Sequence, residues 1–357
     1  GYDRRLEESL ADFDRNIPDT RVGRYIAHLT RRINLLSARM AGEDLAGLQA
    51  YPHPRYDPDL ANVDPALEPD VSSQFNLLSN QYLVWQDPST ALSEEKKQLQ
   101  GWLKYILSTK PDNMNWLVSW ANSQMDLDSI TLEDFWGDRL RNPDHLTIPP
   151  AFTVAGKKAI YELIAAIEDA LPDPLPVTAK KPDFNHWYHQ AYAKIWRDFT
   201  AAFPKGEYWL ADKTAWQQVA GKITTDESPY FAYLDTLAVQ LSALDSETDS
   251  IPWLDLVNHY QIAKTQSNSD NSMQKLGVLA KATKKGKSLL KKIEQVEKKA
   301  ANLGAGLPLE TRMTAAKSYQ AYRKALNDIA LAAESRQVSY QLTVAYFKED
   351  PATSESP

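Results

Sequence analysis

Two histidines near the middle of the chain have the spacing of a pair of metal ligands. His186 and His189 are three residues apart, so a helix would place both imidazoles on one face, close to the carboxylate of Asp183. Aromatic residues occupy the positions around them. Histidines in such a setting are more often packed or surface side chains than ligands. We therefore predict no metal site here.

A second group combines carboxylates with large rings. Glu133, Asp134 and Asp138 stand beside Phe135 and Trp136, and paired carboxylates against an aromatic platform are typical of sites that cleave glycosidic bonds. The alternative is a short helix that Thr131 caps and Gly137 ends, in which the acidic residues stabilise the positive end and the rings pack in the core. We favour this structural interpretation, because closeness in sequence says nothing about the distance between two carboxyl groups.

Two further motifs lack the context that their chemistry needs. Gly286-Lys287-Ser288 ends like a phosphate-binding P-loop, but the position that requires a glycine is Lys281, and no strand precedes it. Ser228 is not in the Gly-x-Ser-x-Gly setting of a hydrolase nucleophile, and it suits the cap of a helix with Pro229 at its first position. We accordingly predict no catalytic, cofactor-binding or metal-binding residues.

A lysine-rich helix is predicted over residues 273–303. Eight lysines lie between Lys281 and Lys299, with leucine, isoleucine and valine opposite. Such a face could dock on anionic lipid or on an acidic partner helix. We favour a solvated charged face, because Glu294 and Glu297 dilute the charge and no Trp or Phe lies opposite.

Composition limits the class of protein. The chain has 357 residues, 43% of them hydrophobic, and a formal net charge of −7. An excess of acidic residues offers no basic face for nucleic acid. The absence of cysteine excludes disulfides and thiol nucleophiles, and it suits the periplasm. No window approaches the ~18 apolar residues of a membrane-spanning helix. Because the sequence begins without Met and shows no signal peptide, we expect a segment of a longer protein.

Apolar residues recur at three- and four-residue steps through most of the chain, which predicts an all-α fold of two or three packed helical subdomains with Pro-rich connections. A first long helix is expected within Asp12–Leu48, with Ile26, Leu29, Ile33, Leu36 and Met40 on its apolar face. Its opposite face carries Arg24, Arg31, Arg32 and Arg39, which we expect to be solvated. Five prolines between residues 51 and 70 predict an extended linker.

Further helices follow in the same way. We expect them over 71–85, 89–108, 113–124, 153–167, 184–203, 206–221, 228–244 and 311–347. In the helix over 228–244, Tyr230 is expected to face inward. Trp85, Trp102, Trp116 and Trp120 are expected to share a core, and the polar strip 265–272 is expected to be a mobile loop. The predicted domains are N-terminal helices at 1–50, a linker at 51–70, a helical core at 71–250, a C-terminal helical region at 251–348 and a tail at 349–357.

Several pieces of the sequence together resemble a known family. They are Trp120-Ala121-Asn122, Asp134-Phe135-Trp136-Gly137, Pro150-Ala151-Phe152-Thr153 with Gly156, the Phe-rich helix end at 199–206, and Ser228-Pro229. In this order they resemble the signature of the TssM family, also called IcmF-related, of bacterial type VI secretion. The resemblance is one of pattern and covers roughly residues 75–350.

The resemblance implies a non-catalytic scaffold segment. The parent would be an inner-membrane protein, and this segment would be its helical periplasmic portion. Its partners would be an outer-membrane lipoprotein (TssJ-like) and an inner-membrane protein (TssL-like), with self-association of the full-length protein and no nucleic acid. The ten tryptophans leave a different class open, an all-α carbohydrate-active enzyme or glycan-binding protein. The absence of a coherent catalytic constellation makes the scaffold the favoured hypothesis.

Overall fold

The computed structural model describes residues 5–6, 8–9, 17–55, 68–85, 90–109, 113–137, 146–242, 244, 252–269, 309–334 and 344. Most of these residues are helical and very few are in strands, which confirms the predicted all-α class. The chain divides into two compact units. The first comprises Gly1–Ser129 and Ile148–Ile195, and the second comprises Ile130–Thr147 and Trp196–Pro357.

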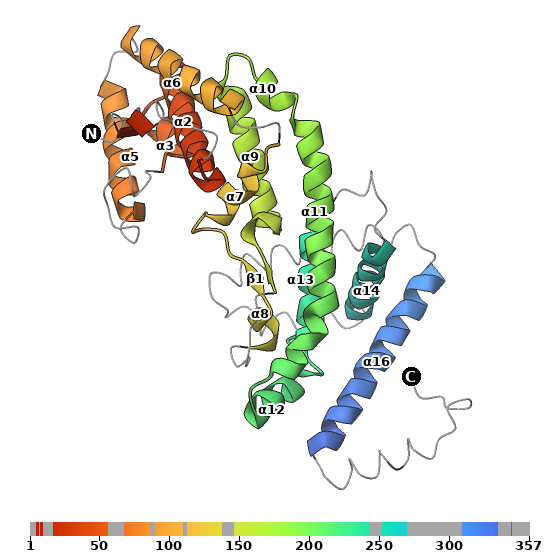
Figure 1. Ribbon diagram of the computed structural model, residues 1–357. Helices are drawn as coiled ribbons and strands as arrows, with labels where there is room; N and C mark the ends of the chain where they lie inside the picture. Colours follow the sequence, from red (N-terminus) through yellow and green to blue (C-terminus); the bar gives the residue numbers. More distant parts are fainter. Residues whose placement is uncertain are drawn as a thin grey trace. The chain divides into compact units, whose positions relative to one another are not determined.

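The first unit is organised around α2 (Asp19–Met40), which contacts α6 (Thr90–Thr109), α7 (Trp116–Asn122) and α9 (Val154–Ala170). These helices surround α2 in the ribbon (Figure 1). The predicted apolar face of α2 is buried except at its end, because Ile26, Leu29, Ile33 and Leu36 face the neighbouring helices while Met40 is exposed. Helix α2 ends before Gly42, whose positive φ of 101° suits a residue without a side chain.

Shorter elements complete the first unit. They are α3 (Leu45–Ala50), α5 (Glu68–Trp85), the 3₁₀ helix η2 (Pro150–Phe152), α10 (Leu175–Thr178) and the first part of α11 (Lys181–Ala202). Two strands of two residues each, β1 (Ile130–Thr131) and β2 (Thr147–Ile148), form a two-stranded sheet whose residues, except Ile148, belong to the second unit. This small sheet does not alter the fold class.

Three of the four arginines that we expected to be solvated instead hold neighbouring segments. Arg31 donates to the carbonyl of His53 at 3.2 Å, and Arg32 donates to Glu95 at 2.7 Å. Arg39 donates to the last two carbonyls before the end of α5, at 3.0 and 3.1 Å. Only Arg24, near the start of the helix, is exposed as predicted. The solvated-face prediction was wrong for these three because their partners lie 22 to 63 residues away in sequence.

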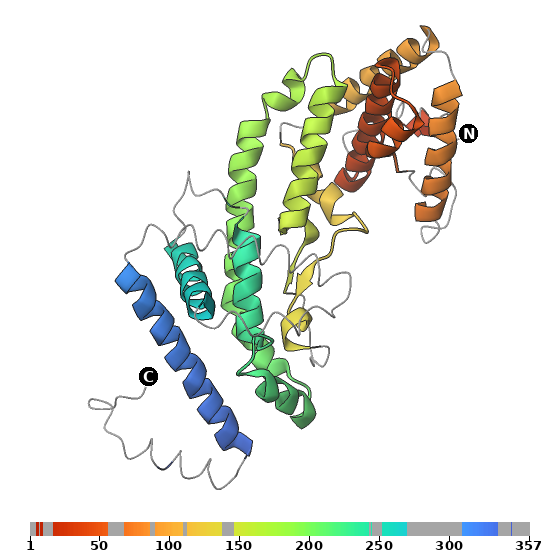
Figure 2. The ribbon, with the colours of Figure 1, turned by 180° about the vertical axis from the view of Figure 1, so that it is seen from behind.

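The second unit contains the end of α11, α8 (Glu133–Trp136), the 3₁₀ helix η3 (Phe203–Trp209), α12 (Lys213–Lys222), α13 (Pro229–Leu241), α14 (Pro252–Ser269) and α16 (Leu309–Glu334). Helices α14 and α16 run side by side, and α13 contacts α14. Figure 2 shows the α14–α16 pair from behind.

Three local predictions are wrong. Residues 265–269 continue helix α14 instead of forming a loop, and Ser267 in this stretch is buried. The side chain of Trp85 is mostly exposed and does not join the core that contains Trp116 and Trp120. Tyr230, expected to face inward, is also partly exposed. For Trp85 and Tyr230, the covering of a helix face depends on contacts that helical periodicity does not specify.

The division into units differs from the predicted domain boundaries, and some other predictions concern residues outside the described ranges. The two units divide the chain at positions other than residues 70 and 250, and both sides of the expected linker belong to the first unit. The lysine-rich segment 273–303, the Gly286-Lys287-Ser288 motif and the tail 349–357 lie outside the description. Within the described ranges, no helix has both the length and the apolar character needed to cross a membrane.

Candidate functional site

The signature residues of the first unit join α7 to η2. Asn122, the last residue of α7, accepts a hydrogen bond through its side-chain Oδ1 from the backbone N–H of Ala151 at 2.8 Å. Ala151 is fully buried, so this amide satisfies a donor that water cannot reach. Trp120, two residues earlier, lies against Gly23 of α2, at a place that a Cβ atom would occupy. These residues therefore hold α7 against η2 and α2.

Thr153, at the predicted start of a helix, caps α9. The Thr153 hydroxyl accepts from the backbone N–H of Gly156 at 3.0 Å and donates to the carbonyl of Pro150 at 2.8 Å. Gly156 has to be small, because a Cβ atom there would collide with the Pro150 carbonyl group. The Pro-Pro turn and the helix start are thereby locked together.

Helix α11 covers this joint with aromatic rings. The Tyr188 hydroxyl donates to the carbonyl of Ala151, and its ring stacks on Phe152 with centroids 5.6 Å apart. Burial raises the pKa of Tyr188, so the hydroxyl stays protonated and keeps its role as a donor. Phe184 also stacks on the Tyr188 ring, with centroids 5.5 Å apart. The ring system is a core, not an open platform.

In the second unit, the acidic signature residues stabilise a short helix. The carboxylate of Asp134 accepts from the backbone N–H of Thr131 at 2.7 Å and from its hydroxyl at 3.1 Å. The N-cap residue is Leu132 and not Thr131 as expected from the sequence. Gly137 ends α8 with a positive φ of 90°, as predicted. Asp138 lies outside the described residues, so the described acids form no facing pair.

The rings of α8 lie in an aromatic cluster with residues of η3 and α13. Phe135 contacts Phe203 and Tyr233 edge-on, at 5.5 and 5.4 Å between centroids. Phe203 and Tyr233 stack at 4.1 Å. Trp136 contacts Phe203 at 5.5 Å, and its indole ring occupies the space beside Gly206 where a Cβ would be. The signature pieces 134–137 and 199–206 therefore meet in one core.

The two histidines of α11 have separate polar partners. The Nε2 of His186 accepts from the side-chain amide of Gln190 at 3.0 Å. The Nε2 of His189 lies 3.4 Å from the ammonium group of Lys157 on another helix. Across the described part of the chain, no three histidine, cysteine or acidic side chains are grouped so that they could hold a metal ion.

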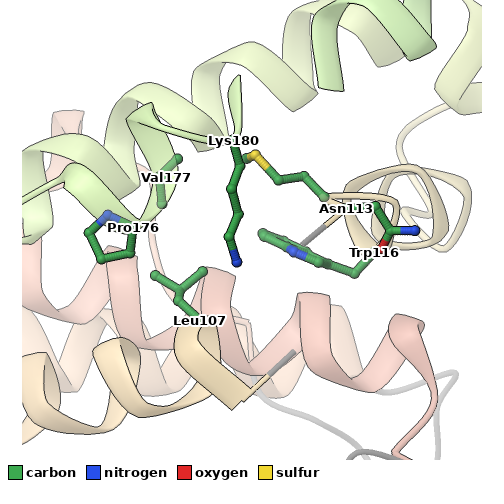
Figure 3. A pocket seen from close by; sticks show the side chains of 7 residues that line it. Leu107, Asn113, Trp116, Pro176, Val177 and Lys180 are labelled. Carbon is green, nitrogen blue, oxygen red and sulfur yellow. The ribbon is translucent and has the colours of Figure 1, made fainter. Parts of the chain in front are cut away.

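A small pocket lies between α6, α7 and α10. Its lining residues are Leu107, Asn113, Met114, Trp116, Pro176, Val177 and Lys180. The ammonium end of Lys180 points between Leu107 and the Trp116 ring (Figure 3). The pocket has room for about one water molecule, which is too little for an organic substrate.

Sequence reasoning missed a charged cluster in the second unit. Lys264 of α14 is buried, and its ammonium group lies 2.6 Å from Oδ2 of Asp235 on α13. Gln261 donates to the other carboxylate oxygen at 3.1 Å. Burial alone lowers the pKa of Lys264, but attraction and hydrogen bonding to Asp235 outweigh it, so that the pKa is raised. A lysine on the inner face of an amphipathic helix is the only sequence signal of this pair.

Another feature that the sequence reasoning missed is the outer face of α5. Its large apolar side chains are substantially exposed, including Trp85, which was expected to lie in a core. The signal was present as a fifteen-residue stretch, 71–85, without a single charged residue. An exposed apolar face of this kind is a candidate docking surface.

Ser228 occupies the N-cap position of α13, with Pro229 at the first helical position as predicted. Its side chain is buried and makes no capping hydrogen bond. Comparison with known proteins adds no further candidate: no family model, no curated protein and no solved structure matches this chain.

Proposed function

We propose that this chain is a non-catalytic scaffold segment of the membrane complex of a bacterial type VI secretion system, similar to the helical periplasmic portion of TssM. One observation carries the proposal: the residues that produce the resemblance are engaged in packing. Asn122 bonds to Ala151, Thr153 caps α9, and Trp136 packs on Gly206. Residues that fix the contacts between helices suit a structural protein.

The aromatic cores support a load-bearing role. Ring pairs contribute about 0.5–1.5 kcal/mol each beyond their buried area, and they fix the geometry of the helices that carry them. Tyr188 and Phe152 connect α11 to η2, while Phe203 and Tyr233 connect η3 to α13. Helices held in this way transmit force with little internal rearrangement, as a segment between two membranes must.

The proposal includes partners and a location. The segment would lie in the periplasm as part of an inner-membrane protein and would assemble with an outer-membrane lipoprotein and a second inner-membrane protein. An all-α carbohydrate-active enzyme is the alternative. It receives less support, because Asp134 is engaged with Thr131 and the Phe135 and Trp136 rings are packed against other rings.

The test is capture from the native envelope. The protein is tagged at its chromosomal locus, the envelope is solubilised in mild detergent, and co-purified proteins are identified by mass spectrometry. We expect a lipoprotein and an inner-membrane protein encoded in the same operon, both absent when an unrelated periplasmic protein carries the tag. Recovery of neither would overturn the proposal. Hydrolysis of cell-wall glycan or polysaccharide by the purified chain would establish the enzyme alternative in its place.

A further inference from the structure

Helix α5 has two faces of opposite character. Its inner face is tied to the first unit by Asn76, which donates to the carbonyl of Pro54 at 3.1 Å, and by Asn80, which donates to Nε2 of His53 at 2.6 Å. Leu83 on the same side is buried in an apolar cluster that includes residues of α2 and α3. The helix is therefore held firmly, and its other face is presented outward.

The outer face is a continuous row of large apolar side chains. Phe75 is 49% exposed, Leu78 62%, Tyr82 56% and Trp85 83%. They follow one another at steps of three, four and three residues, which places them along one stripe of a helix. Their exposed area is on the order of 500 Å², a size at which an apolar patch on a protein surface marks an interaction site.

The spacing of this stripe is symmetric. Phe75 and Trp85 are equally distant from position 80, and so are Leu78 and Tyr82. A two-fold axis at position 80 therefore places Phe75 opposite Trp85 of a second copy, and Leu78 opposite Tyr82. We propose that the outer face of α5, defined by these four side chains, is a homotypic interface at which two copies of the chain pair with their α5 helices antiparallel.

The distribution of charge along α5 is compatible with a second copy as the partner and favours the antiparallel orientation. Residues 71–85 contain no charged side chain, so two identical faces meet without like-charge repulsion. Asp70 is exposed near the N-terminal end of α5, and Arg39 binds carbonyls at the C-terminal end. An antiparallel pair brings unlike ends together and opposes the two helix dipoles.

The area of the α5 stripe limits the affinity of the dimer. A stable interface buries about 800 Å² on each partner, more than this stripe alone supplies. The dimer formed through α5 is accordingly weak and depends on concentration, as suits one contact among several in a larger assembly. This inference does not depend on the proposed secretion role.

Sedimentation velocity of the full chain over a wide concentration range tests the interface. We expect the average mass to rise from that of the 40.3 kDa monomer toward twice that value. Leu78→Glu should raise the dissociation constant at least tenfold, because two charges would be buried near the two-fold axis. Leu256→Glu is the matched control, since Leu256 is 70% exposed on α14 and away from the stripe. Circular dichroism checks that both variants are folded.

The orientation is tested by disulfide trapping, for which the lack of native cysteine is an advantage. In the antiparallel pair, an equimolar mixture of Phe75→Cys and Trp85→Cys proteins should form a mixed disulfide. Trp85→Cys alone should not cross-link, because two such positions lie roughly 15 Å apart along the axis, beyond the reach of a disulfide. Equal cross-linking of Trp85→Cys with itself would overturn the antiparallel arrangement.

Two results would overturn the homotypic interface itself. One is a chain that stays monomeric at all concentrations, and the other is a dimer that Leu78→Glu leaves intact. Binding of the monomer to vesicles of anionic phospholipid, lost in Leu78→Glu, would assign the stripe to a lipid surface in place of a second copy.

Discussion

The ammonium group of Lys264 lies 2.6 Å from the carboxylate of Asp235, and the contact joins α14 to α13 beneath the surface of the second unit. Lys264→Met removes the ammonium group and leaves the carboxylate of Asp235 with Gln261 as its remaining partner. Breaking a buried pair in this way costs about 3–5 kcal/mol. We expect that loss in the free energy of unfolding, measured by urea denaturation.

An exposed pair of the same unit provides the control for this prediction. Lys222 lies 3.3 Å from Glu227, and both side chains are more than half exposed. Lys222→Met should change stability by less than about 1 kcal/mol. Equal effects of the two substitutions would show that the buried pair is no stronger than a surface contact.

The amide of Asn122 supplies the second prediction. Asn122→Ala deprives the buried N–H of Ala151 of its acceptor, which costs about 1–3 kcal/mol. Asn113→Ala is the matched control, because Asn113 is exposed. Thermal unfolding should show a lower midpoint for the first variant only. A midpoint equal to that of the native chain would mean that the hydrogen bond between Asn122 and Ala151 does not stabilise the fold.

Local features of the fold were predictable because they depend on a few neighbouring residues. Thr153 caps α9, Gly137 ends α8, and Pro229 begins α13, each by rules that operate within one turn of helix. The apolar face of α2 followed from its periodicity. These predictions required no knowledge of which segments meet in space.

Features that depend on distant partners were not predictable. Arg32 looked solvated because its partner, Glu95, lies 63 residues away. Trp85 looked like a core residue because ring size predicts burial but not which face of α5 is covered. The same limit applies to the site: the sequence identified Asn122 and Trp136 as members of a pattern, and only the structure reveals what each contacts.

A third prediction concerns two glycines within helices of the first unit. Gly156→Ala should destabilise the protein by about 1–3 kcal/mol, because the added methyl group would collide with the Pro150 carbonyl. Gly101→Ala meets no atom within 4 Å and should be neutral or stabilising by up to about 1 kcal/mol. Urea denaturation of both variants measures the contrast. Similar effects of the two changes would remove the steric explanation.

The last prediction concerns alkaline pH. Thr200 donates its hydroxyl hydrogen to the Trp196 carbonyl at 2.7 Å, so the Tyr233 hydroxyl, 2.6 Å from Thr200, is the donor in that contact. Burial raises the pKa of Tyr233 to about 12. An acidic group whose pKa is raised on folding stabilises the native state fully below its unfolded pKa of 10.0. That stability is lost as the pH rises from there through the folded value.

Tyr233→Phe separates this ionisation from other alkaline effects. The variant should be less stable than the native chain at pH 7 by about 1 kcal/mol, because one hydrogen bond is lost. Between pH 10 and about 12 its stability should fall less steeply, since it lacks the raised pKa. Lys264 keeps its own contribution in both proteins, because its pKa is also raised and its stabilisation is lost only at alkaline pH. Urea denaturation at several pH values measures both slopes, and parallel slopes would show that Tyr233 ionises as freely in the folded chain as in the unfolded one.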